Sequence, residues 1–217
     1  MTVRARPWRA AVGIAGAVGA SVLLLGWATS GFAVLTTDAD RMRRVARDPQ
    51  PVPAVAVRAI DGTVRPVLAE PHDTTARPRA VIVDFVYTRC VTVCGVLGDT
   101  YQQLQRAILE RGLEDRVRLL TVSFDVAHDD PERLARYAMM KRADATVWML
   151  ATPVDTIGRD ALLQTFGVQV VSDENGGWVH NAALHIVDPR GRLVRIMDIS
   201  DVDGALDAAL DAWAATP

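Results

Sequence analysis

A β-like apolar run at 81–86 leads directly into Cys90 and Cys94, the only cysteines of the chain, and a run with helical character follows them. The spacing of four residues places both thiols on one face of that helix. The positive potential at a helix N-terminus lowers the pKa of a nearby thiol. This arrangement predicts a reactive pair that can close a disulfide, chelate a soft metal, or do both in turn. A purely structural disulfide is disfavoured because so short a loop removes little entropy from the unfolded chain.

Strand-like and helix-like segments alternate from residue 54 to the C-terminus. The expected strands are 55–57, 81–86, 117–124, 147–150, 183–187 and 193–199, and the expected helices follow Cys94, begin at Pro131, follow Asp155 and include 206–213. Such alternation predicts an α/β fold with a mixed sheet and helices on both faces. A cysteine pair at the first strand-to-helix turn of this fold favours a thioredoxin-like architecture.

The N-terminal region reads as a membrane anchor. Three arginines precede a stretch at 10–37 that contains no charged residue, which is long enough for a transmembrane helix. We therefore expect residues 1–9 to be cytoplasmic, residues 10–36 to form a transmembrane anchor or signal-anchor, and the rest to be exported. A cleaved signal peptide is the competing interpretation, but the apolar run is longer than a signal peptide requires.

Residues 37–53 are predicted to be a tether, because the prolines at its end favour an extended spacer. Residues 54–217 would then form the folded domain. The charge of the chain is nearly balanced, with 24 Lys and Arg against 26 Asp and Glu. With no basic excess, a nucleic acid is not an expected partner.

The chain has four histidines that could complete a metal site with the two cysteines. His72 and His128 lie in polar loops, and His185 is expected to pack or to face solvent within a strand. His180 stands just before a strand, and in a thioredoxin-like sheet the loop at this place faces the cysteine helix. Met139 and Met140 are expected to be packing residues of a helix rather than metal ligands.

Two thiolates and one imidazole form a donor set for a soft metal. Such a set suits Cu(I) in a three-coordinate site, since thiolates select soft metals. Zinc remains the alternative, with three protein ligands and an open fourth position. Either metal requires reduced and deprotonated thiols, so the redox state of the pair would control metal loading.

The chain resembles the SCO/SenC family of membrane-anchored, thioredoxin-like copper proteins from about Val55 to the C-terminus. The family segment YTxCxxxC stands here as Tyr87-Thr88-Arg89-Cys90 to Cys94. Further matches are Ser123, Asp125, Asp129, Pro131, Leu134, Tyr137 and Ala138, then Trp148, Leu150 and Thr152, and then Phe166-Gly167-Val168. His180 lies nine residues before Pro189, as the family histidine does before its hairpin proline. The chain departs from the family at Val91 and Gly95, where prolines are usual.

The resemblance implies a metallochaperone that delivers copper to the dinuclear centre of cytochrome c oxidase. Cys90, Cys94 and His180 would be the ligands, for Cu(I) and as a further option Cu(II), and Asp125 would have a second-shell or docking role. The partner would be the copper-receiving oxidase subunit or another copper or thiol protein. The Arg-flanked anchor and the Ala- and Arg-rich composition, rather than the resemblance, favour a bacterial inner membrane, crossed once, with the folded domain on the extracytoplasmic side.

Two other classes of function stay open from the sequence. One is an exported thiol-disulfide oxidoreductase that acts on cysteines of a partner protein, with Cys90 and Cys94 as the catalytic redox pair. It would need both cysteines but not His180. The other is an anchored binding domain in which the cysteines are incidental, and replacing both with serine would then leave its function intact.

Overall fold

The computed structural model describes most of the chain beyond the N-terminal region. The described residues are 14, 16–24, 37–69, 78–90, 93–173 and 177–216, with the backbone alone described for Thr37, Val93 and Cys94. The chain divides into two compact units, Met1–Arg43 and Arg44–Pro217. The second unit contains the cysteine pair and the sheet, and it therefore positions the candidate site.

The predicted membrane anchor falls largely outside the described residues. Residues 16–24 are helical, and no described helix combines the length and the apolar character that a membrane crossing needs. The anchor at 10–36 therefore stays a prediction. Within the predicted tether, α2 (Thr37–Arg47) is helical rather than extended. Its first turn is acidic and its last turn basic, a pattern that complements the helix dipole.

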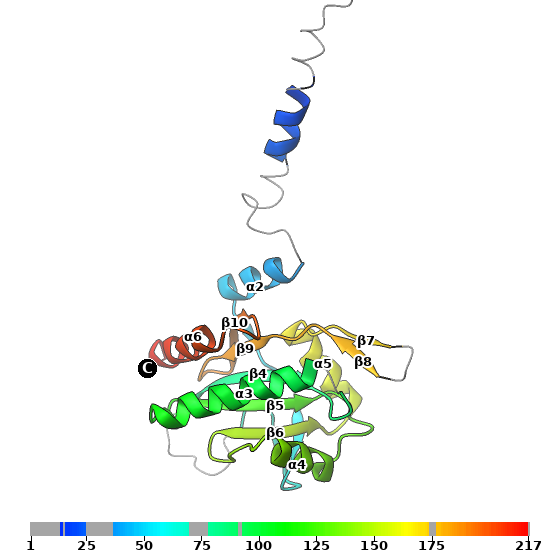
Figure 1. Cartoon of the computed structure of the whole chain (residues 1–217), viewed down its shortest axis with the longest axis vertical. Coiled ribbons are helices and arrows are strands. Elements are labelled where there is room, and N and C mark those ends of the chain that lie inside the picture. The colour runs from blue at the N-terminus through cyan, green and yellow to red at the C-terminus, as the bar shows by residue number, and fades with distance from the viewer. Residues whose placement is uncertain are drawn as a thin grey trace, which may run out of the picture. The chain divides into compact units, whose positions relative to one another are not determined.

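A mixed eight-stranded sheet forms the centre of the second unit, in the order β1-β10-β9-β4-β5-β6-β2-β3 (Figure 1). The strands are β1 (Gln50–Pro51), β2 (Ala56–Ala59), β3 (Val64–Pro66), β4 (Ala80–Val86), β5 (Val117–Ser123), β6 (Trp148–Pro153), β9 (Leu184–Val187) and β10 (Arg192–Met197). β4, β5 and β6 are parallel, and the strands on either side of them are antiparallel. All seven residues of β4 are buried, as expected for a strand covered on both faces.

Helices cover both faces of the sheet. On one face, α3 (Val93–Glu110), α4 (Pro131–Met140) and α6 (Val202–Ala214) contribute Tyr101, Tyr137 and Leu206 to a core cluster that includes Ile82 and Trp148. On the other face, Phe166 of α5 (Thr156–Phe166) packs against Phe85. The predicted α/β class and its layers are confirmed, and the architecture is thioredoxin-like.

Capping residues begin two helices where the sequence predicts them. The side chain of Asp130 accepts a hydrogen bond from the backbone of Arg133 ahead of Pro131, and Asp155 does the same for Gly158. These bonds satisfy backbone N–H groups that have no partner within the helix. α4 therefore starts immediately after the loop at 124–130, which contacts the turn at residues 87–90, here called the cysteine turn.

A short hairpin that the sequence analysis did not predict carries His180. It consists of β7 (Val170–Ser172) and β8 (Trp178–His180), which pair with each other and not with the large sheet. Residues 174–176, between the two strands, lie outside the described part. The polar, glycine-containing stretch reads as a loop, whereas its two ends pair as strands.

Candidate metal centre

The cysteine turn follows β4 directly. The backbone N–H of Cys90 donates to the carbonyl of Tyr87 at 3.1 Å, which closes the turn, and Cys90 is half-buried. α3 begins at Val93, so Cys94 lies in its first turn. The strand–turn–helix order predicted around the pair is confirmed. Residues 91 and 92 and the side chain of Cys94 lie outside the described part, so the distance between the thiols stays a prediction.

The Asp129 carboxylate, in the loop before α4, fixes the cysteine turn through hydrogen bonds. Its carboxylate accepts hydrogen bonds from the backbone N–H of Thr88 at 2.8 Å and from the Thr88 hydroxyl at 2.5 Å, and also from the Ser123 hydroxyl at 2.6 Å. Asp129 is buried. Hydrogen bonds to a buried carboxylate are among the stronger ones in proteins. Asp129 therefore fixes the residues just before Cys90, a role that the sequence analysis did not predict, since it named Asp129 only as a match to the family motif.

Asp125 forms an ion pair with the residue adjacent to Cys90. The Arg89 guanidinium donates to the Asp125 carboxylate at 2.6 Å, and Asp125 is buried while Arg89 is exposed. This bond raises the pKa of Arg89. Asp125 was predicted to have a second-shell or docking role, and the structure places it in contact with the cysteine turn through Arg89.

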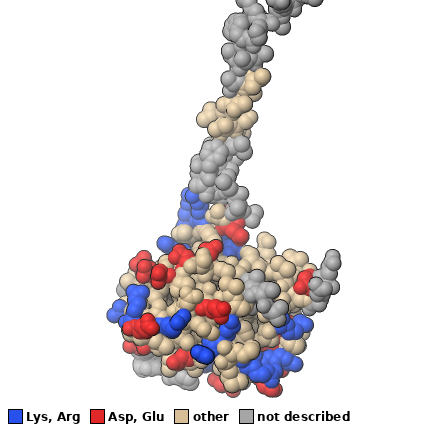
Figure 2. Space-filling model, viewed as in Figure 1, with Lys and Arg blue, Asp and Glu red and all other residues tan. Residues whose placement is uncertain are grey.

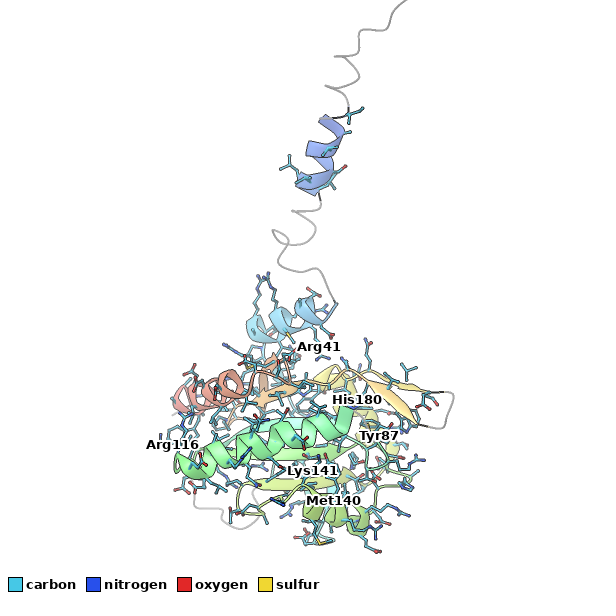
Figure 3. The ribbon with its side chains drawn as sticks, viewed as in Figure 1. Arg41, Tyr87, Arg116, Met140, Lys141 and His180 are labelled. Atoms are coloured by element: carbon cyan, nitrogen blue, oxygen red, sulfur yellow. The ribbon has the colours of Figure 1, made fainter. Side chains whose placement is uncertain are left out.

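Aromatic contacts bring His180 next to the cysteine turn. The His180 ring packs edge-on against Phe124 with centroids 5.2 Å apart, and Phe124 packs against Tyr87 at 5.4 Å. The Tyr87 hydroxyl donates to the carbonyl of Trp178 and accepts from its backbone N–H, both at 3.0 Å. Figure 3 labels Tyr87 and His180 at the same end of α3. Two segments about ninety residues apart in sequence thus meet beside the cysteine turn.

The environment of His180 favours its neutral form. Burial lowers the pKa of the imidazole, and a backbone hydrogen bond involving Asn181 opposes this only in part. A neutral imidazole has a ring nitrogen available for a metal, whereas an imidazolium has none. His180 is therefore suited to bind a metal at neutral pH without first losing a proton.

His185 has a different environment from His180. It is buried in β9, its Nδ1 lies 3.1 Å from the carbonyl oxygen of Val83, and its ring stands edge-on to Phe85 and Phe166. Of the two alternatives predicted for it, packing is correct. His128 is half-buried in the loop before α4, and His72 lies outside the described residues.

A surface groove of about 530 Å³ opens beside the cysteine turn. It is lined by Thr88, Arg89, His128, Arg133, Arg136, Met139 and Met140. The two methionines were predicted to pack, and that prediction is wrong, since 70% and 69% of their surfaces are exposed. Arg133 and Arg136 pair with acidic residues of their own helix region. Acidic and basic residues are likewise interspersed over the face shown in Figure 2.

The described His, Cys, Asp and Glu side chains do not by themselves form a metal site. Among them, no group of three or more His, Cys, Asp or Glu residues is arranged to hold a metal ion. The predicted set of Cys90, Cys94 and His180 contributes only two described side chains to that search. The donor types nevertheless fit copper, because two thiolates and a neutral imidazole are soft or intermediate ligands.

The comparisons with known proteins identify the family. Residues 70–215 match the SCO1/SenC family. The chain belongs to this family. None of the curated proteins matches the chain, whereas many solved structures do.

Three solved members of the SCO1/SenC group illustrate the shared fold. BsSco is a member of the Sco family of cytochrome c oxidase assembly proteins in which a disulfide switch was identified. It is 18% identical with a TM-score of 0.65, over 77% of this chain and 95% of its own. A SCO1/SenC family lipoprotein from Bacillus anthracis is 20% identical with a TM-score of 0.62, over 75% and 98% of the two chains. ScoI of Arabidopsis thaliana, solved with copper bound, is 15% identical with a TM-score of 0.57, over 76% and 95%. At these identities the likeness shows the fold alone.

Proposed function

We propose that this chain binds copper through Cys90, Cys94 and His180 and delivers it during assembly of the dinuclear copper centre of cytochrome c oxidase. The observation that carries this proposal is the contact series Tyr87–Phe124–His180, together with the hydrogen bonds of Tyr87 to Trp178. It brings the strand that ends in His180 to the cysteine turn. Membership of a family that includes proteins solved with copper bound supports the choice of metal.

The residues around the ligands would tune the site rather than bind the metal. Asp129 holds Thr88 and so limits the movement of the turn. Asp125 neutralises Arg89 beside Cys90, which reduces the positive charge that a copper cation would meet. Both thiols must lose their protons on binding, so affinity would rise with pH until the thiols are ionised.

The proposed partner is the copper-receiving subunit of the oxidase or another copper or thiol protein. The groove next to the cysteine turn, with its exposed Met139 and Met140, offers a surface for such a partner. We further propose that the N-terminal segment anchors the chain in a bacterial inner membrane, with the folded unit on the extracytoplasmic side. The uncharged stretch behind the N-terminal arginines supports this location.

The experiment is a competition for Cu(I) between the reduced full-length chain in detergent micelles and a chromophoric chelator. We expect one copper to be retained per chain, and His180→Ala to weaken retention by at least tenfold, because losing even an outer-shell partner of a ligand costs that much. His128→Ala is the matched control, since it removes another half-buried imidazole, one that lines the groove beside the cysteine turn. A parent chain that loses all its copper to the chelator would overturn the proposal.

Thiol-disulfide exchange is the second candidate function. A disulfide switch is described for BsSco, whose fold this chain shares. In this case Cys90 and Cys94 would cycle between dithiol and disulfide, and His180→Ala would leave the reaction intact. The rate at which the parent chain and His180→Ala reduce a model protein disulfide separates this function from copper delivery.

A further inference from the structure

Met139 and Met140 lie side by side at the C-terminal end of α4, and most of the surface of both side chains is exposed. Methionine is otherwise among the residues most often buried in proteins. Both methionines line the groove beside the cysteine turn, together with Arg89, the residue that precedes Cys90. Two adjacent thioethers on the wall of a groove add little to packing, so their chemistry is the more informative property.

The end of α4 that carries the two thioethers is fixed against the first turns of α3. The Lys141 ammonium donates to the carbonyl of Gly95 at 3.0 Å and to the Asp99 carboxylate at 2.8 Å. The stem of the lysine crosses Gly98 so closely that a Cβ added there would collide with it. Met140 directly precedes Lys141 (Figure 3), so the backbone at the two methionines is held beside the helix that contains the second cysteine.

His128 contributes an imidazole to the same groove. Its backbone N–H donates to the carbonyl of Asp125 at 2.9 Å, and its carbonyl accepts from the Arg133 guanidinium at 2.9 Å. The ring itself makes no hydrogen bond and no ion pair with the residues that the structure describes. A ring nitrogen is therefore available for a ligand, on a backbone that hydrogen bonds hold in place.

The three arginines that line the groove do not make it strongly positive, because each of them pairs with a carboxylate. The pairs are Arg89 with Asp125, Arg133 with Asp130, and Arg136 with Glu132. None of the described residues that line the groove is acidic. Hard cations such as Mg²⁺ and Ca²⁺ require carboxylate or carbonyl oxygens, so the groove favours a soft cation of low charge.

We propose that Met139, Met140 and His128 bind one Cu(I) ion in this groove, as an entry site for copper that later reaches the cysteine pair. Thioether and imidazole donors suit Cu(I), since soft ligands select soft metals. Methionine has three rotatable bonds, so the two adjacent sulfurs can turn toward the ion while the imidazole completes a three-coordinate site. The entry role rests on the proposed function, whereas the groove site can exist without it.

Copper passes from the groove to the cysteine pair by exchange of ligands. The bonds of copper to two thioether sulfurs and one imidazole nitrogen break as its bonds to two thiolates and His180 form. Two thiol protons pass to solvent, and copper stays in the Cu(I) state, so no electron acceptor is required. Thiolates are negatively charged and bind Cu(I) more tightly than neutral thioethers do, which gives the transfer its direction.

The test follows the methionine methyl groups of the full-length chain in detergent micelles by NMR, with both cysteines replaced by serine. The methyl carbons are isotopically labelled, and Cu(I) is added without oxygen. We expect the methyl signals of Met139 and Met140 and the ring signals of His128 to shift together as one equivalent binds. The methyl signals of Met149 and Met197, which lie in the sheet, should stay in place.

Replacing the two thioethers should weaken the binding of this ion about tenfold or more. In Met139→Leu/Met140→Leu, leucine keeps the apolar volume but removes two of the three donors. Met197→Leu is the matched control, since it replaces a half-buried thioether in β10 that does not line the groove, and it should leave the affinity unchanged. Groove methyl signals that do not move in an excess of Cu(I), or an unchanged affinity of the double variant, would overturn the site.

The entry role has its own measurement in the intact, reduced chain. Thiolate-to-copper absorption in the ultraviolet reports the rate at which one equivalent of Cu(I) reaches the cysteine pair. This rate should fall in Met139→Leu/Met140→Leu and stay the same in Met197→Leu. Equal rates in all three chains would overturn the entry role.

The groove site and the proposed function can fail separately. A chain without its cysteines reports the groove alone, and if it does not fold, the same methyl signals are followed in the intact chain as a second equivalent of Cu(I) is added. The chelator competition reports only the tighter site, because the groove ion is lost to the chelator, so His128→Ala stays a valid control there. Loss of all copper in that competition would refute the proposed function and leave the groove site standing.

Discussion

The two faces of the central strands bury an ionisable group in contrasting ways. On the face covered by α5, His185 has its Nδ1 3.1 Å from the Val83 carbonyl and two phenylalanine rings around it. On the face covered by α3, Asp84 is equally buried, and neither of its carboxyl oxygens has a hydrogen-bond partner among the described residues. The first side chain has a backbone carbonyl and two aromatic rings as neighbours, whereas the second is a carboxyl whose pKa is raised by burial to about 7.

The contrast predicts that the charge of Asp84 makes stability depend on pH. Its folded pKa of about 7 exceeds the unfolded value of about 3.9, so the folded chain holds the extra proton between these values. The stabilisation is complete below about pH 4 and is lost as the pH rises through 7, by about 4 kcal/mol in total. We expect urea unfolding of Asp84→Asn at pH 4, 6 and 8 to lack this loss.

The ionisation of other carboxylates does not obscure the comparison between the parent chain and Asp84→Asn. Asp61, Asp144 and Asp198 have pKa values lowered mainly by side-chain hydrogen bonds. Their stabilisation is present at neutral pH and lost in acid, the opposite direction, and it is the same in the parent and the variant. A parent and an Asp84→Asn variant with parallel pH curves would show that folding does not raise the pKa of Asp84.

On the face of the sheet covered by α5, a substitution should lower the free energy of unfolding through lost packing. His185→Ala removes a ring between Phe85 and Phe166, and we expect a loss of about 3 kcal/mol in the free energy of unfolding. Urea unfolding of the parent and the variant measures this loss. An unchanged free energy of unfolding would show that the ring does not contribute packing between the two phenylalanines.

Replacing Thr121 should have a smaller effect, both on the free energy of unfolding and on the pKa of Asp84. Thr121→Val keeps the shape of the side chain but leaves the buried Trp148 indole N–H without its acceptor, at a cost of about 2 kcal/mol. The Thr121 hydroxyl also opposes the rise in the Asp84 pKa, so that pKa should rise further in the variant. Denaturant unfolding and NMR titration measure the two effects, and a lower pKa would contradict the assigned cause.

Regular patterns in the sequence predict most of the fold. The apolar residues of β4 and β5 and the capping residues Asp130 and Asp155 are local signals, and the structure confirms the elements they indicate. The β7–β8 hairpin was missed because its exposed, polar residues resemble a loop. The two strands pair with each other, and Trp178 of the second is hydrogen-bonded to Tyr87, ninety-one residues away.

The candidate site is only partly predictable for the same reason. The spacing of the two cysteines indicates reactive thiols, whereas His180 was distinguished from the other histidines by its place before a strand and by the family pattern. Asp129 contacts a residue forty-one positions away, and no local pattern reveals such a contact. Asp84 was read as part of an apolar run, because burial of a single polar residue is decided by what packs against it. Met139 and Met140 were misassigned because helical position alone does not say which face is covered.

If Cys90, Cys94 and His180 bind copper as proposed, the paired hydrogen bonds between Tyr87 and Trp178 affect the kinetics of metal exchange. They join the turn before Cys90 to the strand that ends in His180, so the imidazole does not have to be recruited from a freely moving loop. Much of the conformational entropy of assembling the ligands is then lost during folding, before any metal arrives. A partner that draws the cysteine turn outward must also strain the hairpin, and the force it applies to one ligand is transmitted to the other.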